Sequence, residues 1–170
     1  MNIILIGYRG TGKTTIARII ARKTGFELQN LDAMIVKAAG MNIPEIVAQK
    51  GWDQFRDLES QVLQQVADGD DQILDCGGGI ILRPENRERL RQAGPVFWLT
   101  ASVPVIVERI REDDQRPALT DKSFLEEIQE VLQTRTPLYQ ECAHHRINTD
   151  HQSPEQAAEQ ILELIGFKDD

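Results

Sequence analysis

Residues 7–14 carry the clearest chemical signal in this chain of 170 residues. They read Gly-Tyr-Arg-Gly-Thr-Gly-Lys-Thr and fit the pattern G-x-x-x-x-G-K-[ST] at every required position. Glycines let backbone N–H groups curl around a phosphate, Lys13 can reach the β- and γ-phosphates, and the Thr14 hydroxyl can ligate Mg²⁺. A glycine turn that happens to carry a lysine is the plain alternative, but the strand–loop–helix context favours nucleotide binding. We expect the nucleotide contacts to come from Gly7, Gly10, Thr11, Gly12, Lys13, Thr14 and Thr15.

The rest of the chain narrows the class of nucleotide-binding protein. A switch GTPase would carry an N-K-x-D motif, which is missing, and a D-x-x-G match at residues 75–78 is too loose to count. Small-molecule kinases suit this length, and they need a second substrate pocket and a lid that excludes water. Residues 112–121 are polar and place Arg116 before a proline, so they are our candidate for the lid. An ordinary connector between helices with a solvated arginine is the alternative.

Composition excludes several functions. The 19 basic and 27 acidic residues give a net charge of −8, which argues against a general binder of nucleic acids or anionic membranes. No apolar stretch approaches the ~18 residues of a membrane span, and the N-terminus lacks the basic start of a signal peptide. We therefore expect a cytoplasmic protein whose Cys76 and Cys142 are reduced core residues. The spacing of His144, His145 and His151 matches no zinc motif.

Apolar periodicity predicts strands that alternate with helices. Residues 3–6 form an apolar run that ends in glycine, as in a strand buried on both faces. Ser123 before Glu126, and Ser153 before Pro154, mark two helix starts. Further strands are expected near 26–31, 73–74, 96–99 and 146–148, and helices at 14–24, 33–39, 43–50, 53–68, 83–93, 103–111, 123–139 and 154–166.

This alternation predicts an α/β fold. We expect a P-loop three-layer sandwich, in which a parallel five-stranded sheet has helices on both faces and a lid lies over the site. Residues 1–170 are expected to form a single domain. In such sheets ligands bind at the carboxyl ends of the strands, where the glycine loops after Ile6 and Leu74 fall.

Several motifs in this chain, taken together, resemble the shikimate kinase family. The phosphate loop is shared by many enzymes, whereas an R-x-x-E motif, a triple glycine, an arginine–proline lid and R-x-P-L-Y in this order are far more specific. The resemblance runs from Met1 to about Gly166. Its elements are Leu31-Asp32 followed by Ile35, residues 55–59, Gly77-Gly78-Gly79, residues 116–119 and residues 135–139.

The resemblance implies transfer of the γ-phosphoryl group of ATP to the 3-hydroxyl of shikimate, a step of aromatic amino-acid biosynthesis in the chorismate pathway, with Mg²⁺ as cofactor. Lys13, Asp32 and Arg116 then have catalytic roles. Asp32 would bind the ring hydroxyls and help to deprotonate the attacking one, while Arg116 would close over the transferred phosphoryl group. A helical segment at about 32–60 would bind substrate, and the lid would span about 112–121.

The same resemblance assigns the remaining contacts. Arg56 and Arg135 match the pair that clamps the substrate carboxylate, and Arg109 and Pro154 match residues that flank the adenine. Bidentate arginines suit a carboxylate, and one carboxylate suits a hydroxyl nucleophile as proton acceptor. The amides beside the arginine clamp would come from Gly77, Gly78 and Gly79.

Each of these residues also has a plainer interpretation. Asp32 could cap the helix expected from residue 33, which is the commoner task for an aspartate there. Arg56 and Arg135 on helices are by default solvated, and Pro154 is explained as a first helical residue. Glu59 could hold the Arg56 rotamer through an i, i+3 pair, or form only an ordinary surface pair with it.

Two positions depart from the family pattern. Asn30 stands where the family commonly has an aspartate that helps to organise Mg²⁺, and Val36 replaces a usual acidic residue. Asp75 ends an apolar stretch, where P-loop proteins often carry a metal-binding carboxylate. We therefore expect the metal site to use Thr14 and Asp75.

Three functions compete at this point. The first is phosphorylation of shikimate, and the second is a kinase of the same fold for another hydroxylated acid such as gluconate. The third is a weakened nucleotide-binding module, which Asn30 keeps open. ATP and a small acid are the expected partners, with neither nucleic acid nor membrane, and a monomer is expected.

Overall fold

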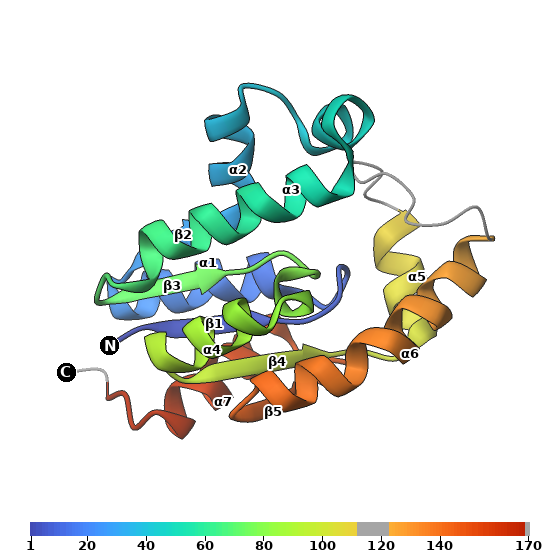
Figure 1. The fold of residues 1–170 in the computed structure, drawn as a ribbon. Helices are drawn as coiled ribbons and strands as arrows, with labels where there is room; N and C mark the ends of the chain where they lie inside the picture. The colour runs from blue at the N-terminus through green and yellow to red at the C-terminus, as the bar shows by residue number, and fades with distance from the viewer. Residues whose placement is uncertain (112–122, 169–170) are drawn as a thin grey trace.

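The computed structural model describes residues 1–111 and 123–168, which contain a five-stranded sheet. Each pair of neighbouring strands is parallel, which confirms the predicted α/β sandwich (Figure 1). The strands are β1 (Ile3–Ile6), β2 (Glu27–Asn30), β3 (Gln72–Asp75), β4 (Val96–Thr100) and β5 (His145–Asn148), and their order across the sheet is β2-β3-β1-β4-β5.

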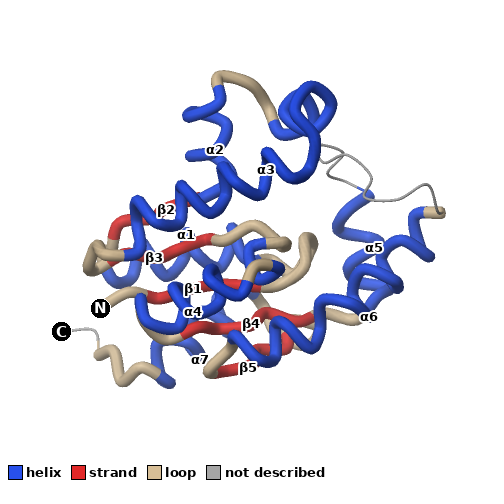
Figure 2. The backbone as a smooth tube through the Cα atoms, viewed as in Figure 1, coloured by secondary structure: helices blue, strands red, loops and turns tan. Residues whose placement is uncertain are grey.

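Helices follow the strands along the chain, as Figure 2 shows. Four helix starts are set by side-chain caps at Asn30, Asn42, Ser123 and Ser153, whose oxygens accept hydrogen bonds from backbone N–H groups. The helices are α1 (Lys13–Thr24), α2 (Leu31–Ala39), α3 (Ile43–Ala67), α4 (Pro84–Ala93), α5 (Val103–Arg111), α6 (Phe124–Cys142) and α7 (Pro154–Leu164), and a 3₁₀ turn spans Ile80–Leu82.

The sheet separates two hydrophobic clusters. Side chains of a strand point alternately to its two faces. Ile3 and Leu5 of β1 therefore pack in one cluster with α1 and α7, whereas Ile4 and Ile6 pack in the other with α3, α4 and α6. Every residue of β1 is buried, as expected for a central parallel strand.

The carboxyl ends of the strands share one edge of the sheet. The arrowheads of β3 and β4 point the same way, toward the side on which α5 and the beginning of α3 lie (Figure 1). The phosphate loop follows β1 and the triple glycine follows β3, and these two strands are hydrogen-bonded neighbours. The strand order thus brings both glycine loops together, as expected for ligand sites in α/β sheets.

Helix α2 differs from the predicted helix at its start, whereas the helical segments of α3 agree with the prediction. Helix α2 begins at Leu31 because Asn30, rather than Asp32, is its N-cap, and Asn30 Oδ1 accepts a hydrogen bond from the Ala33 N–H at 2.9 Å. The capping alternative for Asp32 is therefore wrong. The two helices expected at 43–50 and 53–68 are confirmed as the two helical segments of α3, which are separated by a break at Gly51 (φ 82°, ψ 169°). The predicted substrate-binding segment corresponds to α2 and most of α3.

Both cysteines are buried and free, as predicted. Burial is the main cause that raises the pKa of Cys142 to about 11, so its thiol is protonated at neutral pH. No helix within the described ranges has the length and apolar character needed to cross a membrane.

Candidate active site

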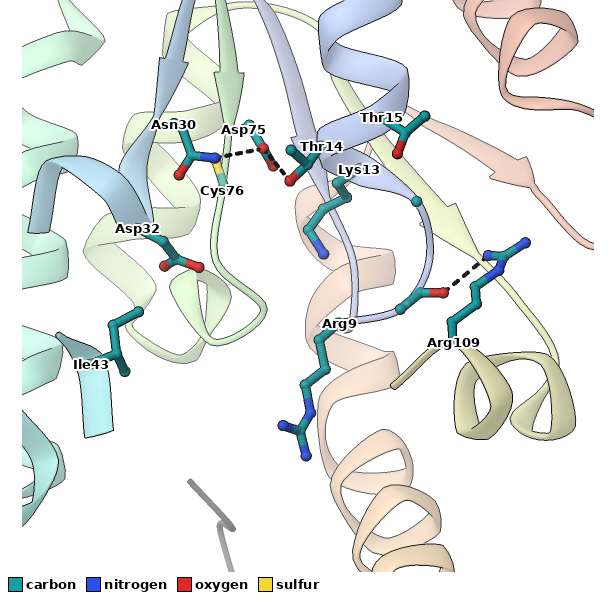
Figure 3. A pocket seen from close by; sticks show the side chains of 12 residues that line it. Arg9, Lys13, Thr14, Thr15, Asn30, Asp32, Ile43, Asp75, Cys76 and Arg109 are labelled. Carbon is teal, nitrogen blue, oxygen red and sulfur yellow. Dashed lines mark hydrogen bonds between the residues drawn. The ribbon is translucent and has the colours of Figure 1, made fainter. Parts of the chain in front are cut away.

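The phosphate loop forms one wall of a cavity of about 500 Å³ at the carboxyl edge of the sheet (Figure 3). Gly7 has no room for a side chain, because a Cβ there would lie 2.5 Å from the carbonyl oxygen of Leu99. Gly12, the N-cap of α1, has φ 91°, which favours glycine. The cavity is lined by Arg9, Gly10, Gly12, Lys13, Thr14, Thr15, Asn30, Asp32, Ile43, Asp75, Cys76 and Arg109.

Lys13 is held over the loop by the loop's own backbone. Its Nζ donates hydrogen bonds to the carbonyl oxygens of Gly7 at 2.7 Å and Tyr8 at 3.0 Å. The side chain is largely buried, and it points into the curve of the loop (Figure 3). The loop thus places a positive charge beside the start of α1, where an anion would also meet the helix dipole.

Thr14, Asp75 and Asn30 form a hydrogen-bonded group beside the loop. Asp75 Oδ2 accepts a hydrogen bond from Thr14 Oγ1 at 2.7 Å and from Asn30 Nδ2 at 3.2 Å, as Figure 3 shows. Burial raises the pKa of Asp75, while Lys13 and the Thr14 hydrogen bond oppose that shift. Asn30 and Asp75 are register partners of β2 and β3, so the parallel pairing sets this contact.

This group has the donor atoms that Mg²⁺ prefers. The Thr14 hydroxyl donates its hydrogen bond to Asp75, so the lone pairs of its oxygen remain available to a cation. Within the described residues, no three His, Cys, Asp or Glu side chains gather as a metal-binding group. That fits Mg²⁺, which usually takes one or two carboxylates together with phosphate oxygens and water.

The triple glycine packs closely against charged side chains from α2 and α3. A Cβ on Gly77 would lie 2.8 Å from Asp32 Oδ1 and 3.0 Å from Glu59 Oε2. A Cβ on Gly79 would overlap the guanidinium group of Arg56. The close approach of Arg56 therefore favours glycine at Gly79.

Arg56 and Glu59 form a buried ion pair. Arg56 Nη1 donates to Glu59 Oε1 at 3.0 Å, and the Glu59 side chain is only 1% exposed. The guanidinium also lies over the rings of Trp52 and Phe55, at 5.4 and 5.2 Å from their centroids. Burial raises the pKa of Glu59, although the charge and hydrogen bond of Arg56 oppose this shift. The alternative of a surface pair is wrong.

Arg135 of α6 faces the same region as Arg56. Arg135 is 7% exposed, so the solvated alternative is wrong for it as well. Its Nη1 lies 3.5 Å from the position of a Cβ on Gly78. The two arginines line one cavity of about 380 Å³, whose other lining residues are Trp52, Asp53, Leu82, Glu130, Val131 and Thr134.

Of the two residues expected near the adenine, only Arg109 lines the cavity beside the phosphate loop. Arg109 Nη1 donates to the carbonyl oxygen of Gly10 at 3.0 Å and to Thr149 Oγ1 at 3.3 Å, so it lies against the phosphate loop. Pro154 is the first residue of α7 and is not among the residues that line the 500 Å³ cavity. Arg116 and the whole predicted lid, residues 112–121, lie outside the residues that the structure describes.

The structure places a charged pair at the site, Arg9 and Glu127, that the sequence motifs did not predict. Arg9 lines the 500 Å³ cavity beside the phosphate loop, which we call the nucleotide-side cavity, and its Nη2 lies 4.0 Å from Oε1 of the buried Glu127 of α6. Arg9 occupies a position of the loop motif at which any residue is allowed, so the motif gives no signal for it. Tyr139 was recognised only as part of a motif, and its hydroxyl donates to the carbonyl oxygen of Gly78 at 2.5 Å.

Comparison with known proteins decides the family. The model of the shikimate kinase family matches residues 9–166. This chain belongs to the shikimate kinase family. Shikimate kinase 2 of Photorhabdus laumondii is 44% identical over 166 residues, covering 96% of this chain and 94% of the relative. Shikimate kinase of Thermodesulfovibrio yellowstonii is 42% identical over 161 residues, covering 95% and 92%.

A solved structure agrees with this family assignment. The structure of shikimate kinase from Acinetobacter baumannii in complex with shikimate superposes with a TM-score of 0.92 at 36% identity. The match covers 96% of this chain and 92% of that one. The shikimate kinase fold is thus present along almost the whole chain.

The buried Glu59 predicts a pH-dependent stability difference. Its raised folded-state pKa means that its contribution to stability is present below the ordinary value of 4.5 and is lost as pH rises through the folded pKa. The side chain introduced by Glu59→Gln carries no charge at any pH. The stability of the Gln variant relative to the unmodified chain should therefore increase between pH 5 and pH 8, as measured by urea unfolding.

Glu163→Gln, on the exposed side of α7, controls for the replacement of a surface carboxylate. If the stability of Glu59→Gln relative to the unmodified chain decreased from pH 5 to pH 8, the raised pKa of Glu59 would be wrong.

Proposed function

We propose that this chain transfers the γ-phosphoryl group of ATP to the 3-hydroxyl of shikimate, giving shikimate 3-phosphate and ADP. One observation carries the proposal. Arg56 and Arg135 line a common cavity, and the triple glycine that packs against them follows β3, the strand beside the phosphate loop. The family membership supports an ATP-dependent kinase, and the Acinetobacter relative, solved in complex with shikimate, supports the acceptor.

The nucleotide half uses the phosphate loop. Amides of Gly7, Gly10, Thr11, Gly12 and residues 13–15 surround the β- and γ-phosphates, as is usual for this loop. Lys13 exchanges its hydrogen bonds to loop carbonyls for the phosphates and neutralises charge that develops during transfer. Arg109, placed against Gly10, flanks the adenine, and Pro154 is proposed on the other side of the base.

The acceptor half holds an acid and activates its hydroxyl. Arg56 and Arg135 bind the substrate carboxylate, since a guanidinium offers two parallel donors to it. We propose that the amides of Gly77, Gly78 and Gly79 assist this clamp, which is supported by the contacts of Gly78 with Arg135 and of Gly79 with Arg56. Asp32 lines the nucleotide-side cavity, so its carboxylate can accept the proton of the 3-hydroxyl as that oxygen attacks the γ-phosphorus.

The metal site uses Thr14 and Asp75. We propose that the Thr14 hydroxyl ligates Mg²⁺ and that Asp75 belongs to its coordination shell, directly or through water. Mg²⁺ would neutralise phosphate charge and orient the γ-phosphoryl group. Arg116 is proposed to supply a further positive charge at the transferred group.

We extend the proposal to the organisation and location of the protein. The chain acts as one domain, with the acceptor site built on residues 32–60 and the lid on residues 112–121. We propose a monomer that works in the cytoplasm and binds neither nucleic acid nor membrane, in agreement with its net charge of −8.

The proposed reaction is tested by ADP release from ATP and Mg²⁺, with shikimate, quinate or gluconate as acceptor. We expect strong stimulation by shikimate and little by the other two acids. Stimulation by gluconate alone would leave phosphoryl transfer intact and refute the acceptor. ATP binding without any acceptor-dependent release would refute the kinase.

Gly79→Ala should impair acceptor binding and also lower stability, because it weakens a buried ion pair. The new methyl group overlaps the Arg56 guanidinium and must displace it from its buried ion pair with Glu59. We expect the KM for shikimate to rise about tenfold or more, in line with loss of a charge-assisted hydrogen bond. The KM for ATP should change little.

Gly78→Ala is the matched comparison, since its Cβ would meet Arg135 Nη1 and the Gly7 carbonyl oxygen at the ordinary distance of 3.5 Å. An equal rise in the KM for shikimate in both variants would contradict the role of the Gly79–Arg56 contact.

Asp75→Asn should raise the Mg²⁺ requirement more than the KM for shikimate. The amide keeps the size of the side chain but removes the negative charge beside Thr14. The Mg²⁺ concentration for half-maximal activity is the measurement, and Asp57→Asn on the exposed face of α3 is the control. An unchanged Mg²⁺ dependence would exclude Asp75 from the metal site.

A further inference from the structure

Asn30 stands where β2 ends and α2 begins, and the two ends of its amide make different hydrogen bonds. Oδ1 accepts from the Ala33 N–H at 2.9 Å and so caps α2. Nδ2 donates to Asp75 Oδ2 at 3.2 Å. The side chain therefore links the first turn of α2, which also carries Asp32, to the end of β3.

Both hydrogen bonds that the Asp75 side chain accepts from the described residues converge on a single oxygen. Thr14 Oγ1 and Asn30 Nδ2 both donate to Oδ2, from opposite sides (Figure 3). The other carboxylate oxygen, Oδ1, accepts no hydrogen bond from the described residues, and Asp75 lines the nucleotide-side cavity. Two donors on one oxygen fix the plane of the carboxylate and leave Oδ1 for another partner.

Asparagine combines two properties that its close substitutes do not share. Aspartate caps a helix equally well, but it cannot donate and would place a second negative charge against Asp75. Serine also caps well, but it lacks the length to reach across to β3. Only a short side chain with both an acceptor and a donor can cap α2 and hold Asp75 at once.

We propose that Asn30 is a positioning residue of the metal site. By holding Oδ2 it orients the Asp75 carboxylate so that Oδ1 faces a divalent cation bound with the nucleotide phosphates. Partners in the outer shell of a metal site typically set affinity in this way. The inference rests on the proposed role of Thr14 and Asp75 in binding Mg²⁺.

The test compares Asn30→Ser with Asn42→Ser. Asn42 caps α3 in the same way, with Oδ1 accepting from the Glu45 N–H at 2.9 Å, but its Nδ2 donates to Glu45 Oε1 at the surface. The same exchange thus keeps a helix cap in both variants and removes the bond to Asp75 in only one. Circular dichroism and thermal melts check that both helices are retained.

The readout is binding of a fluorescent ADP analogue, titrated with Mg²⁺ in the absence of acceptor. We expect Asn30→Ser to raise the Mg²⁺ concentration at half-maximal binding roughly tenfold, which is the low end for outer-shell partners. Asn42→Ser should leave it unchanged. Equal midpoints in the two Ser variants would overturn the proposal.

A double-mutant cycle separates positioning from a merely structural effect. If Asn30 acts through Asp75, Asn30→Ser should shift the Mg²⁺ midpoint little further in an Asp75→Asn background. An undiminished shift in that background would refute the inference. Wild-type binding that needs no Mg²⁺ would refute the metal site itself and the inference with it. Neither result would bear on phosphoryl transfer to shikimate, which the ADP-release assay tests separately.

Discussion

Strand β3 lies between β1 and β2, and the site depends on this placement. Parallel strands end at the same edge of the sheet, so the segments that follow them must share that edge. The β1–β3 pairing sets the phosphate loop beside the triple glycine, and the β2–β3 pairing sets Asn30 beside Asp75. The backbone pairing of the strands therefore brings the phosphate loop, the triple glycine and the Asn30–Asp75 pair to one edge of the sheet.

Around that edge the chain buries several charges. Glu59 and Arg135 are almost fully covered, and so is Glu127, the partner of Arg9. The desolvation cost of a buried ion pair is often as large as its Coulombic attraction, so such pairs are weak evidence for stability. These ion pairs instead fix the orientation of the charged side chains at the site. Glu59 fixes the direction of the Arg56 guanidinium, and the rings of Trp52 and Phe55 limit its movement.

Much of this architecture could be predicted because it depends on local signals. Short runs of adjacent residues are enough to predict the phosphate loop, the start of α7 at Ser153 and the break near Gly51. The position of the α2 cap was missed because Asn30 and Asp32 are both good capping residues, and only the end of β2 decides between them. The burial of Glu59 and the Arg9–Glu127 contact depend on packing between segments far apart in the chain, which no local pattern encodes.

The contacts of Lys13 also bear on the hydration of its ammonium group. The carbonyl dipoles of Gly7 and Tyr8 take the place that water molecules would hold around a lysine at the surface. An incoming anion therefore meets a cation that has already lost much of its water shell during folding. Less solvent has to be reorganised when the anion arrives, and the attraction acts through a medium of lower dielectric constant than bulk water. The loop carbonyl groups thus solvate the Lys13 ammonium group in a fixed arrangement, in place of mobile water.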